Sequence, residues 1–122
     1  MTATYHAPGV VLTEREHLVP LDHARPDGEQ ITVFTREVAA PDGLDRPYLV
    51  FLQGGPGFEA TRPTSPPSGW IRCALAEYRV LLIDQRGTGR STPVGEHIPG
   101  TRWLALAIIV AGVGLQAWSG RR

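Results

Sequence analysis

Two short apolar runs, each followed by a turn that contains glycine, most constrain how this chain of 122 residues folds. Residues 48–52 and residues 80–83 are uninterrupted apolar runs, which are typical of strands buried on both faces of a parallel sheet. Between them, apolar residues from 70 to 78 follow helical spacing. The strand at 48–52, the helix at 70–78 and a strand at 79–84 predict a parallel βαβ unit, for which a right-handed crossover is the strong default.

A β-hairpin is predicted before this unit. Residues 17–22 form a short extended run, and because its Pro20 cannot donate a ladder hydrogen bond, we expect a strand near a sheet edge. Pro-Asp-Gly at 26–28 predicts a turn, and the alternation over 31–38 predicts the second strand. A second Pro-Asp-Gly at 41–43 closes the hairpin. His6 is assigned to a frayed N-terminus.

The loop after the first apolar run is the most informative for chemistry. Gln53, Gly54, Gly55, Pro56 and Gly57 follow the strand directly, and ligands of open α/β sheets bind at the carboxyl ends of strands. Glycines there let backbone amides approach a developing negative charge, which is what an oxyanion hole requires. Taken alone, the pattern also fits a structural turn.

The second apolar run leads into a second loop that contains glycine. Its residues are Asp84, Gln85, Arg86, Gly87, Thr88, Gly89, Arg90 and Ser91. A phosphate-cradling loop fails on spacing, because the Gly-Lys-Ser/Thr of a P-loop and the third glycine of a dinucleotide fingerprint are both absent. Together, the two loops closely resemble the paired signature of the proline iminopeptidase family of α/β-hydrolases. The resemblance covers residues 17–94, and the hairpin resembles that of the subgroup preferring bulky N-terminal residues.

This resemblance implies the N-terminal portion of an α/β-hydrolase fold. Intact members are serine-type aminopeptidases, which release an N-terminal residue, often proline, from a peptide substrate without metal or cofactor. Carried over to this sequence, the backbone N–H of Gly55 would contribute to the oxyanion hole. Asp84 and Arg86 would brace the second loop, and Gly87 and Gly89 would allow its tight turns.

The catalytic triad of the family has no counterpart in these residues. The nucleophile belongs in a Gly-x-Ser-x-Gly elbow, followed by an aspartate and a histidine. No serine has glycines at both flanking positions, and the histidines are assigned to surface or turn positions: Ser65, Ser68, Ser91 and Ser119; His6, His17, His23 and His97. We therefore expect a catalytically incomplete chain with an unfinished sheet, whose open edge at 48–52 favours self-association.

The sequence changes character near residue 95. Residues 1–95 are assigned to the hydrolase part and residues 96–122 to an anomalous apolar tail, expected to contain an apolar helix from Trp103 to Trp118. That segment is slightly shorter than the roughly twenty residues that span a bilayer. A short membrane anchor and a frameshifted end both remain open. The frameshift is preferred, because the resemblance stops where the composition changes. The alternative function is a non-catalytic membrane-tethered or interaction module.

Composition bears on the possible partners of the chain and on its location. Twelve basic and twelve acidic residues balance, which argues against nucleic-acid binding through a basic face. The single cysteine, Cys73, cannot form an internal disulfide and is interpreted as a small buried apolar residue. Residues 1–9 lack the pattern of a signal peptide, so a cytoplasmic location is expected.

Overall fold

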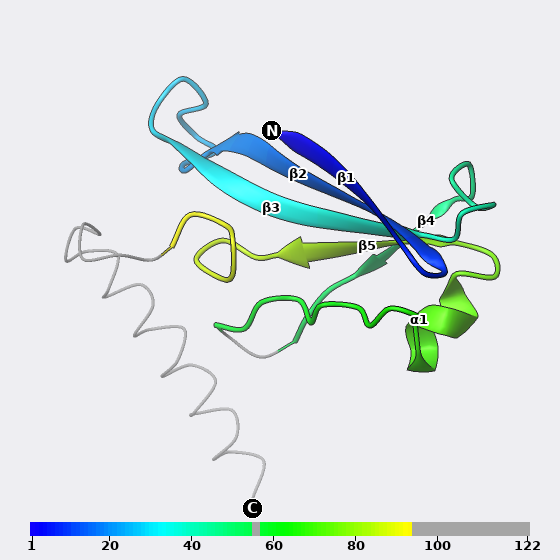
Figure 1. Ribbon diagram of the computed structural model, residues 1–122. Helices are drawn as coiled ribbons and strands as arrows, with labels where there is room; N and C mark the ends of the chain where they lie inside the picture. Colours follow the sequence, from blue (N-terminus) through cyan, green and yellow to red (C-terminus); the bar gives the residue numbers. More distant parts are fainter. Residues whose placement is uncertain (55–56, 94–122) are drawn as a thin grey trace, which may run out of the picture.

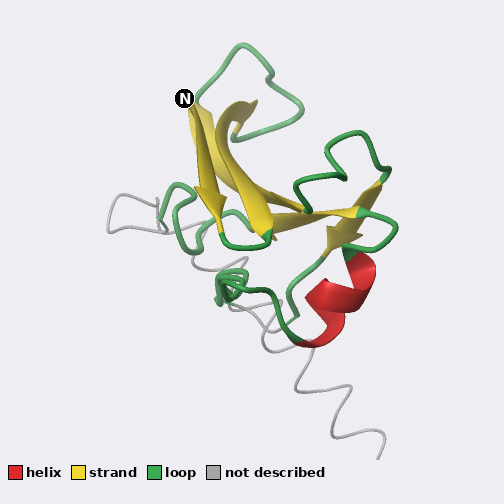
Figure 2. Ribbon diagram, turned by 45° about the vertical axis from the view of Figure 1, so that its right-hand side comes forward, coloured by secondary structure: helices red, strands yellow, loops and turns green. Residues whose placement is uncertain are grey.

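A computed structural model describes residues 1–54 and 57–93, which form a five-stranded sheet with a helix against one face (Figures 1 and 2). The strand order is β1-β2-β3-β5-β4, and only the β4–β5 pair is parallel. The elements are β1 (Thr2–Ala7), β2 (Val10–Pro20), β3 (Gln30–Ala39), β4 (Tyr48–Phe51), α1 (Gly69–Ala74) and β5 (Arg79–Asp84). The predicted mixed α/β class is confirmed at this level.

The predicted hairpin is confirmed, since β2 and β3 pair antiparallel, but its first strand is longer than expected. The predicted strand at 17–22 corresponds to the end of β2, and its expected position near a sheet edge is confirmed, because this part of β2 pairs with β3 alone. Pro20 fits because β1 pairs with β2 only as far as Arg15. The prediction of a frayed N-terminus is wrong, because His6 lies in β1 and pairs with Val11.

The βαβ unit is confirmed in its order and in the parallel pairing of β4 with β5. The helix is shorter than predicted: α1 ends at Ala74 with Leu75 as its C-cap. The expectation that β4 is a central strand is wrong for the described residues, because β4 is the last strand of the sheet. The described elements leave most of its apolar side chains partly uncovered, and Val50 is 49% exposed.

The core lies between the sheet and the segment that carries α1. Alternation along β5 directs Val80, Leu82 and Asp84 inward, as expected for a strand with period two. The buried cluster comprises Val10, Val38, Ala60, Leu75, Val80 and Leu82. Ala60 anchors the chain just beyond the first loop. The prediction that Cys73 is buried is wrong, because the six-residue α1 contributes no buried residue and Cys73 is exposed.

Several predictions concern residues outside this description. Gly55, Pro56 and the whole tail from residue 94, including the segment between Trp103 and Trp118, belong to that group. Among the described helices, none has the length and apolar character needed to cross a bilayer. The two assigned sequence regions, the cytoplasmic location and the origin of the tail stay predictions.

Candidate functional site

The two loops predicted to carry chemistry lie side by side. β4 and β5 are parallel neighbours, so their carboxyl ends meet at one edge of the sheet (Figure 1). The Gln85 side-chain amide donates a hydrogen bond to the Gln53 carbonyl, with Nε2 and O 3.0 Å apart. This contact joins the first residue after β5 to the loop after β4. The site is therefore built from the first loop, residues 53–57, and from the second loop, which in the structure begins after Asp84, the last residue of β5, and is described as far as residue 93.

The described glycines of the first loop border open space. Gly57 has φ +91°, a conformation that favours glycine. A Cβ added at Gly54 or at Gly57 would meet no atom of the described residues within 4 Å. The backbone on both sides of residues 55–56 is thus accessible to an approaching group.

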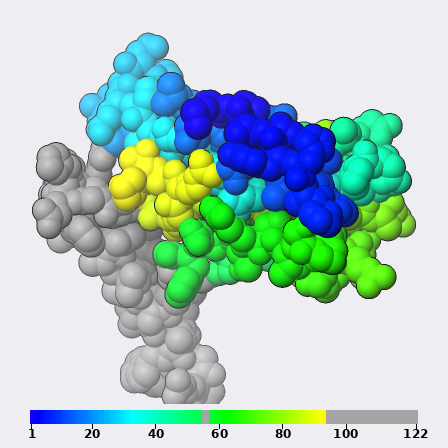
Figure 3. Space-filling model, in the orientation of Figure 1, coloured from blue at the N-terminus to red at the C-terminus, as the bar shows by residue number. Residues whose placement is uncertain are grey.

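Asp84 joins the second loop to the segment that follows the first loop. Its side chain is buried, and its two carboxylate oxygens accept hydrogen bonds from different segments: Oδ1 from the Ala60 N–H at 3.0 Å and Oδ2 from the Arg90 N–H at 3.0 Å. Figure 3 shows the second loop beside the segment that follows the first. Because both oxygens serve as acceptors for the main chain, the arrangement makes Asp84 a structural acceptor.

The second loop is held against β3. Ser91 is 2% exposed, and its hydroxyl donates to the Asp84 carbonyl at 2.6 Å while accepting the Phe34 N–H at 2.9 Å. Thr32 and Thr92 then exchange two hydrogen bonds, which continue the contact beyond the end of β5. The Ser91 hydroxyl is committed on both sides, so it has no freedom to attack a substrate.

Two glycines shape this loop. Gly87 has φ +83° and donates its N–H to the Thr92 carbonyl at 3.2 Å, while Gly89 has φ +51°. Arg86 points away from the first loop. It donates to the Leu21 carbonyl at 3.1 Å and contacts Nε2 of His23 at 2.9 Å, an acceptor in the tautomer protonated on Nδ1. Arg86 therefore ties the second loop to the turn of the hairpin.

Sequence reasoning missed a charged cluster behind the loops. Glu14 on β2 accepts hydrogen bonds from Arg36 on β3 and from Arg90 in the second loop. Burial raises the pKa of the Glu14 carboxyl, but the hydrogen bonds from Arg90 and Arg36 outweigh this and hold the pKa below its ordinary value of 4.5. The sequence offers no local signal for this cluster, because residues 10–16 run from three apolar residues into three charged ones without the alternation of a half-buried strand.

Two hollows adjoin the site. A groove of about 330 Å³ runs beside Gln53 over the Phe51–Trp70 ring pair, whose centroids are 4.7 Å apart. A smaller polar hollow of about 220 Å³ lies over Asp84 and Ala60. Among the residues described, no three histidine, cysteine, aspartate or glutamate side chains gather to hold a metal ion.

Comparison with known proteins adds relatives by sequence. No protein-family model matches the chain. Over 79 residues, 62% of the chain, it is 60% identical to the proline iminopeptidase of Aeromonas sobria, covering 18% of that protein. It is 39% identical over 80 residues, 62% of the chain, to a proline iminopeptidase of Aspergillus aculeatus, covering 17% of that protein. It is 36% identical over 81 residues, 64% of the chain, to the proline iminopeptidase of Xanthomonas citri, covering 22% of that protein.

The chain thus spans about a fifth of the length of these curated relatives. The matched stretch is the N-terminal portion of those proteins. By sequence, this chain is therefore homologous to the N-terminal portion of proline iminopeptidases, as its paired loop motifs had indicated.

Proposed function

We propose that this chain forms the N-terminal part of an α/β-hydrolase of the aminopeptidase type, and that its first loop binds an acyl anion. One observation carries the proposal: the Gln85–Gln53 hydrogen bond joins two loops at the carboxyl ends of parallel neighbouring strands. That edge is where open α/β sheets bind ligands. The homology to proline iminopeptidases supports the same reading.

In this proposal the first loop provides half of an oxyanion hole. The Gly55 N–H would donate to the anion that develops when an acyl carbonyl is attacked, and the second donor would follow the nucleophile. Because Gly54 and Gly57 have no side chains, the backbone beside them can meet the substrate. The substrate class is a peptide with a free N-terminus, and the reaction uses no metal or cofactor.

We further propose that the chain is inactive by itself. Its sequence contains no Gly-x-Ser-x-Gly elbow, and the best-placed serine near the loops, Ser91, is buried with its hydroxyl committed at both donor and acceptor positions. Without a nucleophile and base, an oxyanion hole retains only a small part of the rate acceleration.

Fragment complementation tests this function. The chain is co-expressed with the part of the Aeromonas sobria enzyme that follows its matched N-terminal portion, and release of p-nitroaniline from prolyl p-nitroanilide is measured. Activity that needs both pieces, and disappears when the elbow serine of the second piece is replaced by alanine, supports the proposal. Hydrolysis by the chain alone would overturn the inactive assignment. A copurifying but inactive pair would overturn the hydrolase role.

A second candidate, a non-catalytic interaction module, is favoured by the free edge of β4. Among the described strands β4 pairs with β5 alone, and Tyr48, Val50 and Leu52 are 44%, 49% and 70% exposed. Unprotected apolar edges pair with other strands. A second copy of the chain, which presents the same edge, is the proposed partner, and sedimentation over a range of concentrations tests this.

A further inference from the structure

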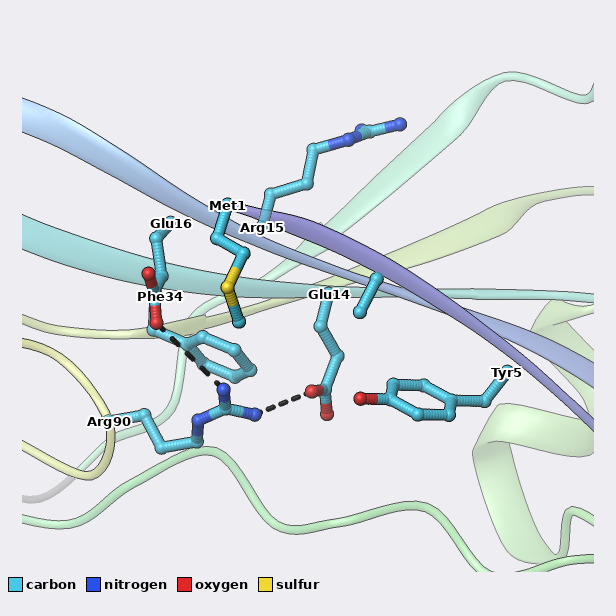
Figure 4. Close-up of a pocket in the computed structure, with 8 residues that line it drawn as sticks. Met1, Tyr5, Glu14, Arg15, Glu16, Phe34 and Arg90 are labelled. Carbon is cyan, nitrogen blue, oxygen red and sulfur yellow. Dashed lines mark hydrogen bonds and ion pairs between the residues drawn. The ribbon is translucent and has the colours of Figure 1, made fainter.

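A charged cluster centred on Glu14 connects the hairpin to the second loop, and Figure 4 shows Arg90 reaching Glu14 beside the Phe34 ring. The Glu14 side chain is 13% exposed, and each carboxylate oxygen has its own arginine. Oε1 accepts from Arg36 Nε at 3.0 Å and Nη2 at 2.9 Å, while Oε2 accepts from Arg90 Nη1 at 2.5 Å. Arg36 belongs to the neighbouring strand, but Arg90 reaches Glu14 from the second loop.

From Arg90 the connection continues toward the first loop. The Arg90 N–H donates to Asp84 Oδ2 at 3.0 Å, and Asp84 Oδ1 accepts the Ala60 N–H at 3.0 Å. Ala60 is 2% exposed and lies three residues beyond Gly57. An unbroken series of contacts thus runs from a strand near the N-terminus to the backbone beside the proposed oxyanion loop.

Glu14 stabilises this series of contacts because it lies between two positively charged side chains. Both guanidinium groups lie against the Phe34 ring, with Arg90 Cζ 4.1 Å and Arg36 Cζ 5.2 Å from its centroid. Two like charges this close repel unless an anion lies between them. Glu14 supplies that anion, so its removal would push Arg90, the more exposed of the two arginines, away from the ring and from Asp84.

Glu14 itself lines only a small cavity, of about 20 Å³, which holds about one water molecule. This cavity is lined by Met1, Ala3, Tyr5, Glu14, Arg15, Glu16, Phe34 and Arg90. The hollow of about 220 Å³ over Asp84 is lined by Arg36 and Arg90 but not by Glu14. The effect of Glu14 on the site must therefore be transmitted through Arg90.

We propose that Glu14 is a positioning residue that, through Arg90 and Asp84, holds in place the second loop and the backbone at Ala60 just beyond the first loop. The importance of those loops for chemistry rests on the proposed function, but the coupling itself does not. Glu16, whose carboxylate is 3.9 Å from Arg90 Nη2 and 38% exposed, has no such role and offers a matched control on the same strand.

Amide hydrogen exchange in the ¹⁵N-labelled 122-residue chain tests the coupling. Exchange rates of the Ala60 and Arg90 amides are compared with those of the ladder amides in β3 and β5. In Glu14→Gln and in Arg90→Gln, we expect Ala60 and Arg90 to exchange about tenfold faster or more, while the ladder amides keep their rates. Glu16→Gln should leave all of these rates within about twofold.

Arg90→Gln keeps the Glu14–Arg36 pair, so it tests the same link if Glu14→Gln does not fold. The proposal is overturned if Arg90→Gln leaves Ala60 protected, or if exchange accelerates equally at Ala60 and along the ladder, since either result makes the cluster a general stabiliser. Failed complementation with the Aeromonas sobria fragment, together with selective loss of protection at Ala60, would refute the hydrolase role and leave the coupling intact.

Discussion

An ideal Cβ on Gly89 would lie 2.2 Å from Oδ2 of Asp84, well inside the 3.0 Å that real Cβ contacts essentially never breach. Gly89 also adopts φ +51°, where a side chain costs about 1–2 kcal/mol. Asp84 can approach the Arg90 N–H because position 89 has no side chain. This relationship assigns a physical reason to one glycine of the second loop.

Replacing Gly89 with alanine should lower the free energy of unfolding by about 3 kcal/mol, the sum of backbone strain and a weakened hydrogen bond to a charged acceptor. Urea unfolding followed by circular dichroism measures the change. Gly54→Ala is the control, because Gly54 lacks a positive φ and its added Cβ meets no atom of the described residues within 4 Å; its effect should stay within about 0.5 kcal/mol. Equal losses in both variants would contradict this account.

Asp84→Asn should destabilise the chain by about 2 kcal/mol, because one of the two accepting oxygens becomes an N–H₂ group facing a backbone N–H. The same urea titration measures it. Asp45→Asn, at an exposed position for which no interaction is seen, provides the control and should change little. If Asp84→Asn leaves the free energy of unfolding unchanged, the backbone N–H that lost its acceptor is hydrogen-bonded to water instead, which contradicts this account.

The local part of this fold could be predicted from sequence, and the long-range part could not. The run at 79–84 coincides with β5, and both Pro-Asp-Gly turns occur where expected. An apolar run indicates that a strand is buried, but not which element packs against it. The run at 48–52 therefore predicted a central strand, whereas β4 is the edge strand of the described sheet. The same gap explains Cys73, whose apolar neighbours do not reveal that α1 is short.

The charged strand at the N-terminus shows a second limit. Glu14 is expected on a surface when only its neighbours in sequence are considered. In the structure, Arg36 and Arg90 make its burial tolerable, and these partners are 22 and 76 residues away in sequence. The candidate loops were found because glycine patterns are local, whereas the residue proposed to position them depends on tertiary pairing.

Acidification should weaken the fold through Glu14. Its folded pKa lies below 4.5, so the carboxylate contributes stability above pH 4.5, and this contribution is lost as the pH falls from 4.5 through the folded value. Glu14→Gln should therefore show a smaller decline in unfolding free energy than the parent chain between about pH 6 and about pH 3. Urea titrations at each pH measure this. Glu16→Gln should follow the parent; a parallel decline in Glu14→Gln would refute the assignment.

The edge of β4, which no other described strand pairs with, should make the chain associate as its concentration rises. Val50 lies at the centre of the strand, and a charged side chain there opposes pairing with a second edge, as lysine does in natural edge strands. We expect Val50→Lys to sediment as a monomer at concentrations where the parent chain forms larger species. Leu44→Lys adds the same charge at another exposed apolar residue, in the turn before β4, and should associate like the parent. If both variants become monomeric, association depends on apolar surface in general, and if neither does, β4 is not the contact.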